Sequence, residues 1–406
     1  MMSRQSIAMT ALLFSSLVAT YPVWAGEKGS DLVQAQTAPP EASLLDIGIL
    51  VFDLGLPDDA RGLRKLEAMG IFEEVRRSEA LYIPVHLERT LQKAGFWGAV
   101  RLVPSASIVD VTVSGTILSS NGGELKLKIR AVDSRGKVWL DKRYKGKANA
   151  SIYLRRESTD EPFQELYNQI ANDLLSKRKQ LGEKNVQAID TISRLRFAAD
   201  LAPVALSDYL ETKKKNRYSV ARLPARDDPM MARVDKLRQR DRMFIDVLDT
   251  HYGDFYTQMQ EAYSGWRSQN YWEREALKHS AESSTGGGTS VGIISTSGVL
   301  PWEGTGPVCG TPGVFGGFEQ KKRFEQVQRE AEAKKKSHIE ELRELGASLA
   351  SDMTPLLVEV EGKVLQLTGS VEAQYASWRE LLREIFATET GLPVISSSAP
   401  VDSDDS

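Results

Sequence analysis

The chain has 406 residues, with 52 Lys and Arg against 55 Asp and Glu, for a formal charge of −3. Without a dense basic tract, this balance gives no electrostatic footprint for nucleic acid, so nucleic-acid partners are excluded. The one cysteine, Cys309, excludes an intramolecular disulfide, and the length predicts two or three domains.

Residues 1–25 have the pattern of a secretory signal peptide. Arg4 precedes the apolar stretch Ile7–Val18, and Val23-Trp24-Ala25 follows as a cleavage site. The apolar stretch is shorter than the roughly 20 residues that cross a bilayer. Gly26 stands where a lipoprotein would carry cysteine, so the sequence predicts a periplasmic or otherwise exported chain without a lipid anchor. Residues 26–43 are polar and aperiodic, which predicts a disordered spacer.

Residues 44–182 are predicted to form an α/β sandwich domain. An apolar run at Leu45–Asp53 indicates a buried strand, and Ala80–Gly95 has helical periodicity with a glycine stop. Four further strands are predicted, the last three joined by two tight turns, followed by a helix at Pro162–Leu181. The strands are expected at residues 97–103, 109–118, 125–133 and 138–144.

This domain contains a series of motifs that resembles a known envelope fold. The series comprises Ile47–Asp53, Ala80–Gly95, Ala106–Gly115 and the hairpin Val132–Trp139. It is similar to the periplasmic α/β domain shared by the curli secretion channel lipoprotein and the N-terminal module of the Tol-Pal propeller protein. The resemblance implies a docking platform in the cell envelope. The lipid-bearing cysteine of the lipoprotein members is missing, so pore formation is not implied.

The second half is predicted to be mainly helical. Residues 183–228 form a helical connector, interrupted at Pro203, and Asp228 is placed to cap a helix that begins at Pro229. Two long helices over residues 229–351 are expected to pair as an antiparallel hairpin. Between them, residues 283–317 hold 11 of the 31 glycines and Glu303 as the only charge, which predicts a Gly-rich tip.

The C-terminal part, residues 352–392, reads as a small β-β-α element. Its segment Val358–Val371 resembles the N-terminal part of a BON domain, a small envelope module. Residues 393–406 are predicted to be a disordered acidic tail. The fold class expected for the whole chain is therefore α+β.

One short pattern occurs twice, on two predicted helices. Tyr-x-x-Trp-Arg is formed by Tyr263, Trp266 and Arg267, and again by Tyr375, Trp378 and Arg379. At i, i+3 the two rings share a helix face, and the arginine can stack or pair with a carboxylate. The pattern is interpreted as ordinary aromatic packing, as a helix–helix seam, or as a partner-binding site, since such sites favour these residue types. Trp302 in the Gly-rich segment is a further candidate for partner binding.

No catalytic, cofactor-binding or metal-binding residues are predicted. The four histidines are far apart, with His86 interpreted as a helix-surface residue, and no nucleophile elbow or phosphate-binding loop occurs. The expected function is therefore non-enzymatic: binding or assembly through contacts with envelope proteins, with peripheral membrane contact and oligomeric state left open. The alternatives are an envelope hydrolase with a scattered site, and an outer-membrane or secretion component that inserts residues 283–317.

Overall fold

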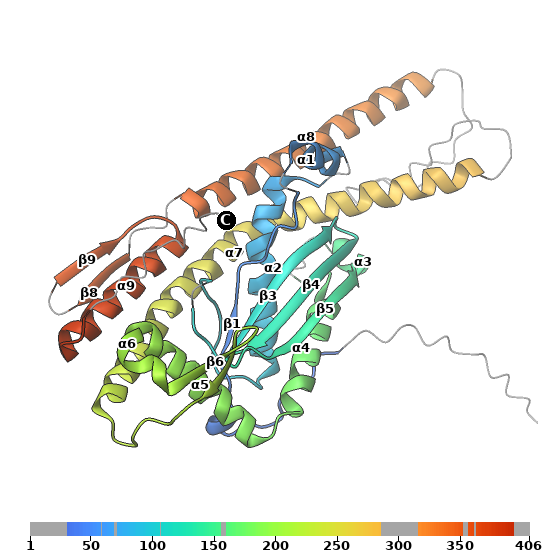
Figure 1. Ribbon diagram of the computed structural model, residues 1–406. Helices are drawn as coiled ribbons and strands as arrows, with labels where there is room; N and C mark the ends of the chain where they lie inside the picture. Colours follow the sequence, from blue (N-terminus) through green and yellow to red (C-terminus); the bar gives the residue numbers. More distant parts are fainter. Residues whose placement is uncertain are drawn as a thin grey trace, which may run out of the picture.

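The computed structural model describes residues 31–57, 59–68, 71–105, 107–155, 160–285, 316–351, 356–360 and 363–393. The predicted signal peptide, most of the Gly-rich segment and the acidic tail lie outside these residues. The α+β class is confirmed: a mixed five-stranded sheet is combined with two long helices that pack together (Figure 1).

The sheet has the strand order β2-β1-β3-β4-β5, with β1 parallel to both of its neighbours and β3, β4 and β5 antiparallel. All three residues of β1 are buried, as expected of a central strand. Gly48 is needed there, since a Cβ atom would lie 2.7 Å from the Val103 side chain. The five strands are Ile47–Ile49 (β1), Val100–Leu102 (β2), Val111–Ser120 (β3), Glu124–Asp133 (β4) and Val138–Lys147 (β5).

Two helices, α2 (Glu73–Ala94) and α4 (Gln164–Lys179), pack against one face of the sheet (Figure 1). α2 begins before the predicted Ala80 and ends at Gly95, which adopts the left-handed conformation (φ 72°). The short helices α1 (Ala60–Ala68) and α3 (Ala150–Tyr153) lie in the connections.

Part of the predicted spacer is attached to this domain. The amide of Val33 donates to Asn172 Oδ1 of α4 (3.0 Å), and the amide of Ala35 donates to the carbonyl of Ala94 (2.9 Å). Residues 31–35 therefore have fixed partners in the structure.

The connector is helical only in its first part. α5 (Glu183–Leu201) and α6 (Pro203–Leu206) are followed by a hairpin, β6 (Leu210–Lys213) and β7 (Arg217–Val220), where continued helix was predicted. Lys215 and Asn216 turn the chain with positive φ. Because the amide of Tyr218 donates to the carbonyl of Arg135 (3.0 Å), the hairpin is held by the β4–β5 turn, a tertiary contact that local periodicity does not reveal.

The two long helices are α7 (Pro229–Thr285) and α8 (Gly316–Ser351). The predicted cap of α7 is confirmed: the amide of Met230 donates to Asp228 Oδ1 (2.9 Å). α7 is one continuous helix, and Gly265 lies where α8 approaches it, since a Cβ atom there would be 2.7 Å from His338 Nε2. α7 also covers the edge strand β2, whose Leu102 amide donates to Asp249 Oδ1 (2.7 Å).

The C-terminal β-β-α order is confirmed by β8 (Leu356–Val360), β9 (Lys363–Leu367) and α9 (Val371–Thr390). α9 packs on α5 and α7, so the hydrophobic core runs continuously from the sheet through α7 to α9. Among the described residues, no helix is both long and apolar enough to cross a membrane.

Candidate functional site

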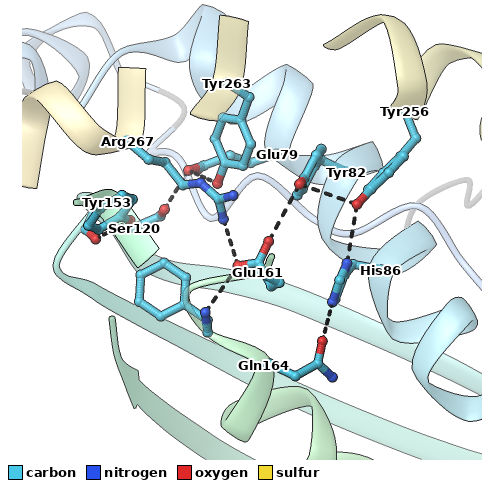
Figure 2. A network of polar contacts seen from close by, with 12 residues as sticks. Glu79, Tyr82, His86, Ser120, Tyr153, Glu161, Gln164, Tyr256, Tyr263 and Arg267 are labelled. Carbon is cyan, nitrogen blue, oxygen red and sulfur yellow. Dashed lines mark hydrogen bonds and ion pairs between the residues drawn. The ribbon is translucent and has the colours of Figure 1, made fainter. Parts of the chain in front are cut away.

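Two residues of the first copy of the repeated motif, Tyr263 and Arg267, belong to a buried polar network (Figure 2). Tyr263, Trp266 and Arg267 are all at most 2% exposed. The Tyr263 hydroxyl donates to Glu79 Oε1 of α2 (2.9 Å), and Arg267 Nη1 donates to Glu161 Oε1 (2.7 Å). The guanidinium of Arg267 also lies over the Tyr263 ring, 4.4 Å from its centroid. The motif therefore fixes α7 to α2 and to the segment that precedes α4.

Glu161 and Arg267 form an ionised pair in the interior. Burial by itself would raise the pKa of Glu161, but the positive charge of Arg267 outweighs it and lowers that pKa. For Arg267 the same balance holds with opposite sign, because the charge of Glu161 outweighs burial and raises the pKa. The amide of Phe163 also donates to Glu161 Oε1 (3.2 Å). The negative charge of the carboxylate is therefore stabilised both by the Arg267 guanidinium and by a backbone amide.

A second carboxylate, Glu79, lies close to this pair on the inner side of α2. It accepts from the hydroxyls of Tyr263 and of Ser120 on β3, and its Oε2 is 3.2 Å from Arg76 Nη1. The two glutamates and two arginines balance in charge, which lowers the cost of enclosing them.

A branch of the network extends along α2 to α4. The Tyr82 hydroxyl donates to Glu161 Oε2 (3.5 Å), and the hydroxyl oxygens of Tyr82 and Tyr256 are 3.3 Å apart. His86 Nε2 is 2.8 Å from Gln164 Oε1, and Nδ1 is 3.3 Å from the Tyr256 hydroxyl. Because the amide oxygen of Gln164 can only accept, Nε2 carries the proton. His86 is thus a partly buried member of the network, hydrogen-bonded on both ring nitrogens, rather than a residue of the solvated helix surface as the sequence was interpreted.

Burial keeps the titratable side chains of the network uncharged at Tyr82, Tyr263 and His86. Burial raises the pKa values of Tyr82 and Tyr263 well above their usual range, so both remain neutral hydroxyls. Burial also lowers the pKa of His86, which favours the neutral ring. The chemistry that this arrangement supports is charge compensation and hydrogen bonding between α2, α4, β3 and α7.

The second copy of the motif, on α9, repeats the geometry with different partners. The Tyr375 hydroxyl donates to Asp241 Oδ2 of α7 (3.3 Å), and Arg379 pairs with Asp241 (3.3 Å) and with Asp200 of α5. Trp378 stacks on Phe244, with ring centroids 4.9 Å apart. Burial raises the pKa of Asp241 even though Arg379 opposes the effect.

The structure brings each triplet together but keeps the two triplets apart. Arg267 and Asp241 are 26 positions apart on α7, which corresponds to about 39 Å along the helix. Trp266 and Trp378 are buried, as their helical periodicity predicts. All six residues contact other parts of this chain from the interior, which supports the helix–helix seam interpretation. Trp302 lies outside the described residues.

The partners of the arginines were not identified from the sequence. Glu79, Glu161, Asp200 and Asp241 come from four separate segments, and each is an ordinary charged residue in its local pattern. One signal was present on α2, where Val75, Glu79, Tyr82 and His86 follow steps of four, three and four along one helix face. A carboxylate on a helix face made otherwise of apolar and aromatic residues indicates that a buried cation or hydrogen-bond donor lies opposite it.

Among the described residues, no group of three or more His, Cys, Asp or Glu side chains could hold a metal ion. A cavity of about 20 Å³ lies between the sheet and α7, lined by Asp46, Arg238, Asp241 and Arg242 among others. It has room for about one water molecule.

Comparison with known proteins finds no matching family model, no matching curated protein and no matching solved structure. Functional assignment therefore depends on the geometry of this chain.

Proposed function

We propose that this protein is an exported, envelope-associated protein that acts by binding and assembling other proteins rather than by catalysis. The observation that carries the proposal is the attachment of a long helical hairpin to an α/β sandwich. α7 is anchored to the sandwich by the buried Glu161–Arg267 pair, and beyond that point α7 and α8 continue side by side past the sheet (Figure 1).

The contacts between α7 and α8 support a projecting arm that keeps its shape. Lys335 Nζ of α8 is 2.6 Å from Glu273 Oε2 of α7, and Gln269 Nε2 donates to the carbonyl of Ala331. His338 packs against Gly265, where the two helices approach closely. A paired arm fixed to a folded base can hold a recognition segment at a distance from that base, as scaffold and assembly proteins do.

The sequence patterns agree with an envelope location. The signal-peptide pattern over residues 1–25 and the resemblance of residues 44–182 to envelope docking modules both favour export. Under this proposal the α/β sandwich is the base, and residues 283–317, which join the two arm helices, hold the contact with the partner.

The proposal is tested by cross-linking in cells, followed by recovery of the protein from the envelope fraction. Two forms are compared: the full chain, and a variant in which residues 286–315 are replaced by a short Gly/Ser linker. The full chain should yield specific cross-linked proteins, and the variant should lose them. Its melting temperature should change little, because loop-closure entropy depends only weakly on loop length.

Two outcomes would contradict the proposal. The first is a full chain that yields no specific cross-linked protein from the envelope. The second is a variant that stays folded and retains every partner.

A further inference from the structure

Within the part of the chain that the structure describes, no helix packs on the face of the sheet opposite α2 and α4 over β3, β4 and β5, and this face is called the open face below. Along β4 the side chains alternate between the covered face and this open face, so that Leu125, Leu127 and Ile129 are buried. Lys128 and Arg130, between and after them, are exposed. The outward positions of β3 are Thr112, Ser114, Thr116 and Leu118, all at least partly exposed.

This open face is strongly basic, although the whole chain has a formal charge of −3. Six of its outward side chains on β4 and β5 are cationic and two are carboxylates, an excess of four positive charges. The cations are Lys126, Lys128, Arg130, Arg143, Lys145 and Lys147, and the carboxylates are Glu124 and Asp141.

The strand register places like charges directly opposite each other. Lys126 is the partner of Lys145, and Lys128 is the partner of Arg143. Such pairs destabilise a sheet. Glu124 compensates part of the charge, since its two oxygens are 2.6 Å from Lys126 Nζ and from Lys145 Nζ.

The other carboxylate is more distant from its neighbours. Asp141 is 3.7 Å from Lys128 Nζ and 3.9 Å from Arg130 Nε. The two carboxylates are thus shared among four of the six cations, and among the described residues Arg143 and Lys147 form no ion pair. The face keeps an excess of four positive charges, which attracts an anionic partner.

We propose that the open face of β3, β4 and β5 is a docking surface for an acidic, extended segment of a partner protein. Outward side chains recur about every 7 Å along a strand, which is also the spacing of alternate side chains in an extended peptide. The Thr116 hydroxyl lies beside the basic rows, opposite Lys128, and can donate a hydrogen bond to such a segment. The inference adds a second contact surface, on the α/β base, for the partner that residues 283–317 are proposed to contact. It names the chemistry of the partner segment at that surface, and so rests on the binding role proposed above.

Two other polyanions fit the surface less well. The outward positions of β3, β4 and β5 hold no aromatic side chain, so a single-stranded nucleic acid would have no stacking platform. A twisted sheet face meets a flat bilayer along only part of its length, which leaves some of the cations away from anionic headgroups.

The test measures binding of a fluorescent peptide of alternating glutamate and serine to the full chain, by anisotropy at low and moderate salt. The unaltered protein should bind it, more weakly as salt rises. The variant Lys126→Gln/Lys128→Gln/Arg143→Gln should bind about tenfold more weakly, because three exposed charge contacts are lost. It should melt no lower than the unaltered chain, since two like-charge pairs are removed.

The matched control is Lys213→Gln/Lys214→Gln/Lys215→Gln, which removes three exposed lysines from the β6–β7 hairpin. Peptide binding should be unchanged in this variant. The inference is overturned if the unaltered chain does not bind the peptide, or if both variants weaken binding equally. It is also overturned if phosphatidylglycerol vesicles or an oligonucleotide bind more tightly than the peptide through the same three residues.

The outcome is separable from that of the proposed function. If the sheet variant keeps every cross-linked partner of the full chain in cells, the docking inference fails and the binding role stands. If the full chain gives no specific cross-linked partner, the binding role itself fails, whatever the peptide result.

Discussion

The two copies of the Tyr-x-x-Trp-Arg motif bury an arginine in different surroundings. Arg267 and its partner Glu161 have side chains that are 2% and 1% exposed, and among the described residues each is the other's only ion-pair partner. Arg379 is shared between the buried Asp241 and the 32% exposed Asp200, which also pairs with Arg383. The same local pattern thus gives a closed pair on α7 and a partly solvated network on α9.

The motif determines which side chains share a helix face. The carboxylates that lie opposite determine how much folding stability is lost when the arginine is removed. In the closed pair neither charge has an alternative partner, so removal of one leaves the other buried and uncompensated. In the open network a second arginine and nearby water remain available. Substitution of either arginine, and of ionisable groups elsewhere in the core and in the arm, should therefore differ in the loss of stability that it causes.

Arg267→Met should give the largest loss of stability, about 3–5 kcal/mol, because Glu161 is left buried without its counter-charge. The free energy of unfolding from urea titration, monitored by circular dichroism, measures it. The double variant Glu161→Gln/Arg267→Met is the control and should recover part of the loss, since no isolated charge remains. If the free energy of unfolding of Arg267→Met were within about 1 kcal/mol of that of the unaltered chain, Glu161 would have another source of charge compensation, such as water.

Arg379→Met should cost less, about 1.5–3 kcal/mol, the range for hydrogen bonds to charged groups. Asp200 keeps Arg383 at 2.9 Å, and Asp241, whose pKa burial already raises, can take up a proton instead of remaining charged. The same urea titration measures the effect. A loss equal to or larger than that of Arg267→Met would contradict the distinction between the two networks.

A third buried contact, between α2 and α7, brings two carboxyl groups together. Burial, together with the charge of Asp249, raises the pKa of Glu88 to about 8, and burial raises the pKa of Asp249 to about 6. Arg89, Arg101, Gln92 and Asp246 also face this pair. Both carboxyl groups keep their protons to higher pH in the folded state than in the unfolded chain. The stability that these two protonated groups contribute is therefore fully present below about pH 4 and is lost as the pH rises to about 8.

Glu88→Gln should therefore flatten the dependence of stability on pH between about pH 5 and pH 8. The slope that Glu88 contributes is at most about 1.4 kcal/mol per pH unit. Urea titrations at several pH values measure it, with Glu183→Gln at an exposed position of α5 as control. An unchanged slope in Glu88→Gln would mean that the folded protein does not hold this proton.

Lys335→Met should have the smallest effect, below about 1 kcal/mol, because Glu273 in the arm is 40% exposed and water can replace the lysine. Thermal unfolding is sufficient to measure it. A loss as large as that of Arg379→Met would show that the arm helices depend on this ion pair much as the core depends on its buried arginines.

Much of the fold could be predicted from local signals. Five strand segments, the glycine end of α2, the Asp228 cap of α7 and the C-terminal β-β-α order each depend on the side chains of a few neighbouring residues. The two long helices were predictable because their apolar stripes recur at helical spacing for many turns. The β6–β7 hairpin was missed because its backbone is held by the β4–β5 turn, some 80 residues away in the chain.

The sequence by itself determined that Tyr263, Trp266 and Arg267 share one face of α7, and that Tyr375, Trp378 and Arg379 share one face of α9, since helical spacing dictates it. Only the tertiary structure decided what those faces meet. Glu79 and Glu161 are separated from Arg267 by more than 100 residues, and although helical spacing places Glu79 on the apolar face of α2, nothing in the local sequence of either carboxylate identifies Arg267 as its neighbour. Burial and charge compensation are properties of the assembled core, because they depend on which segments enclose a group and exclude water from it.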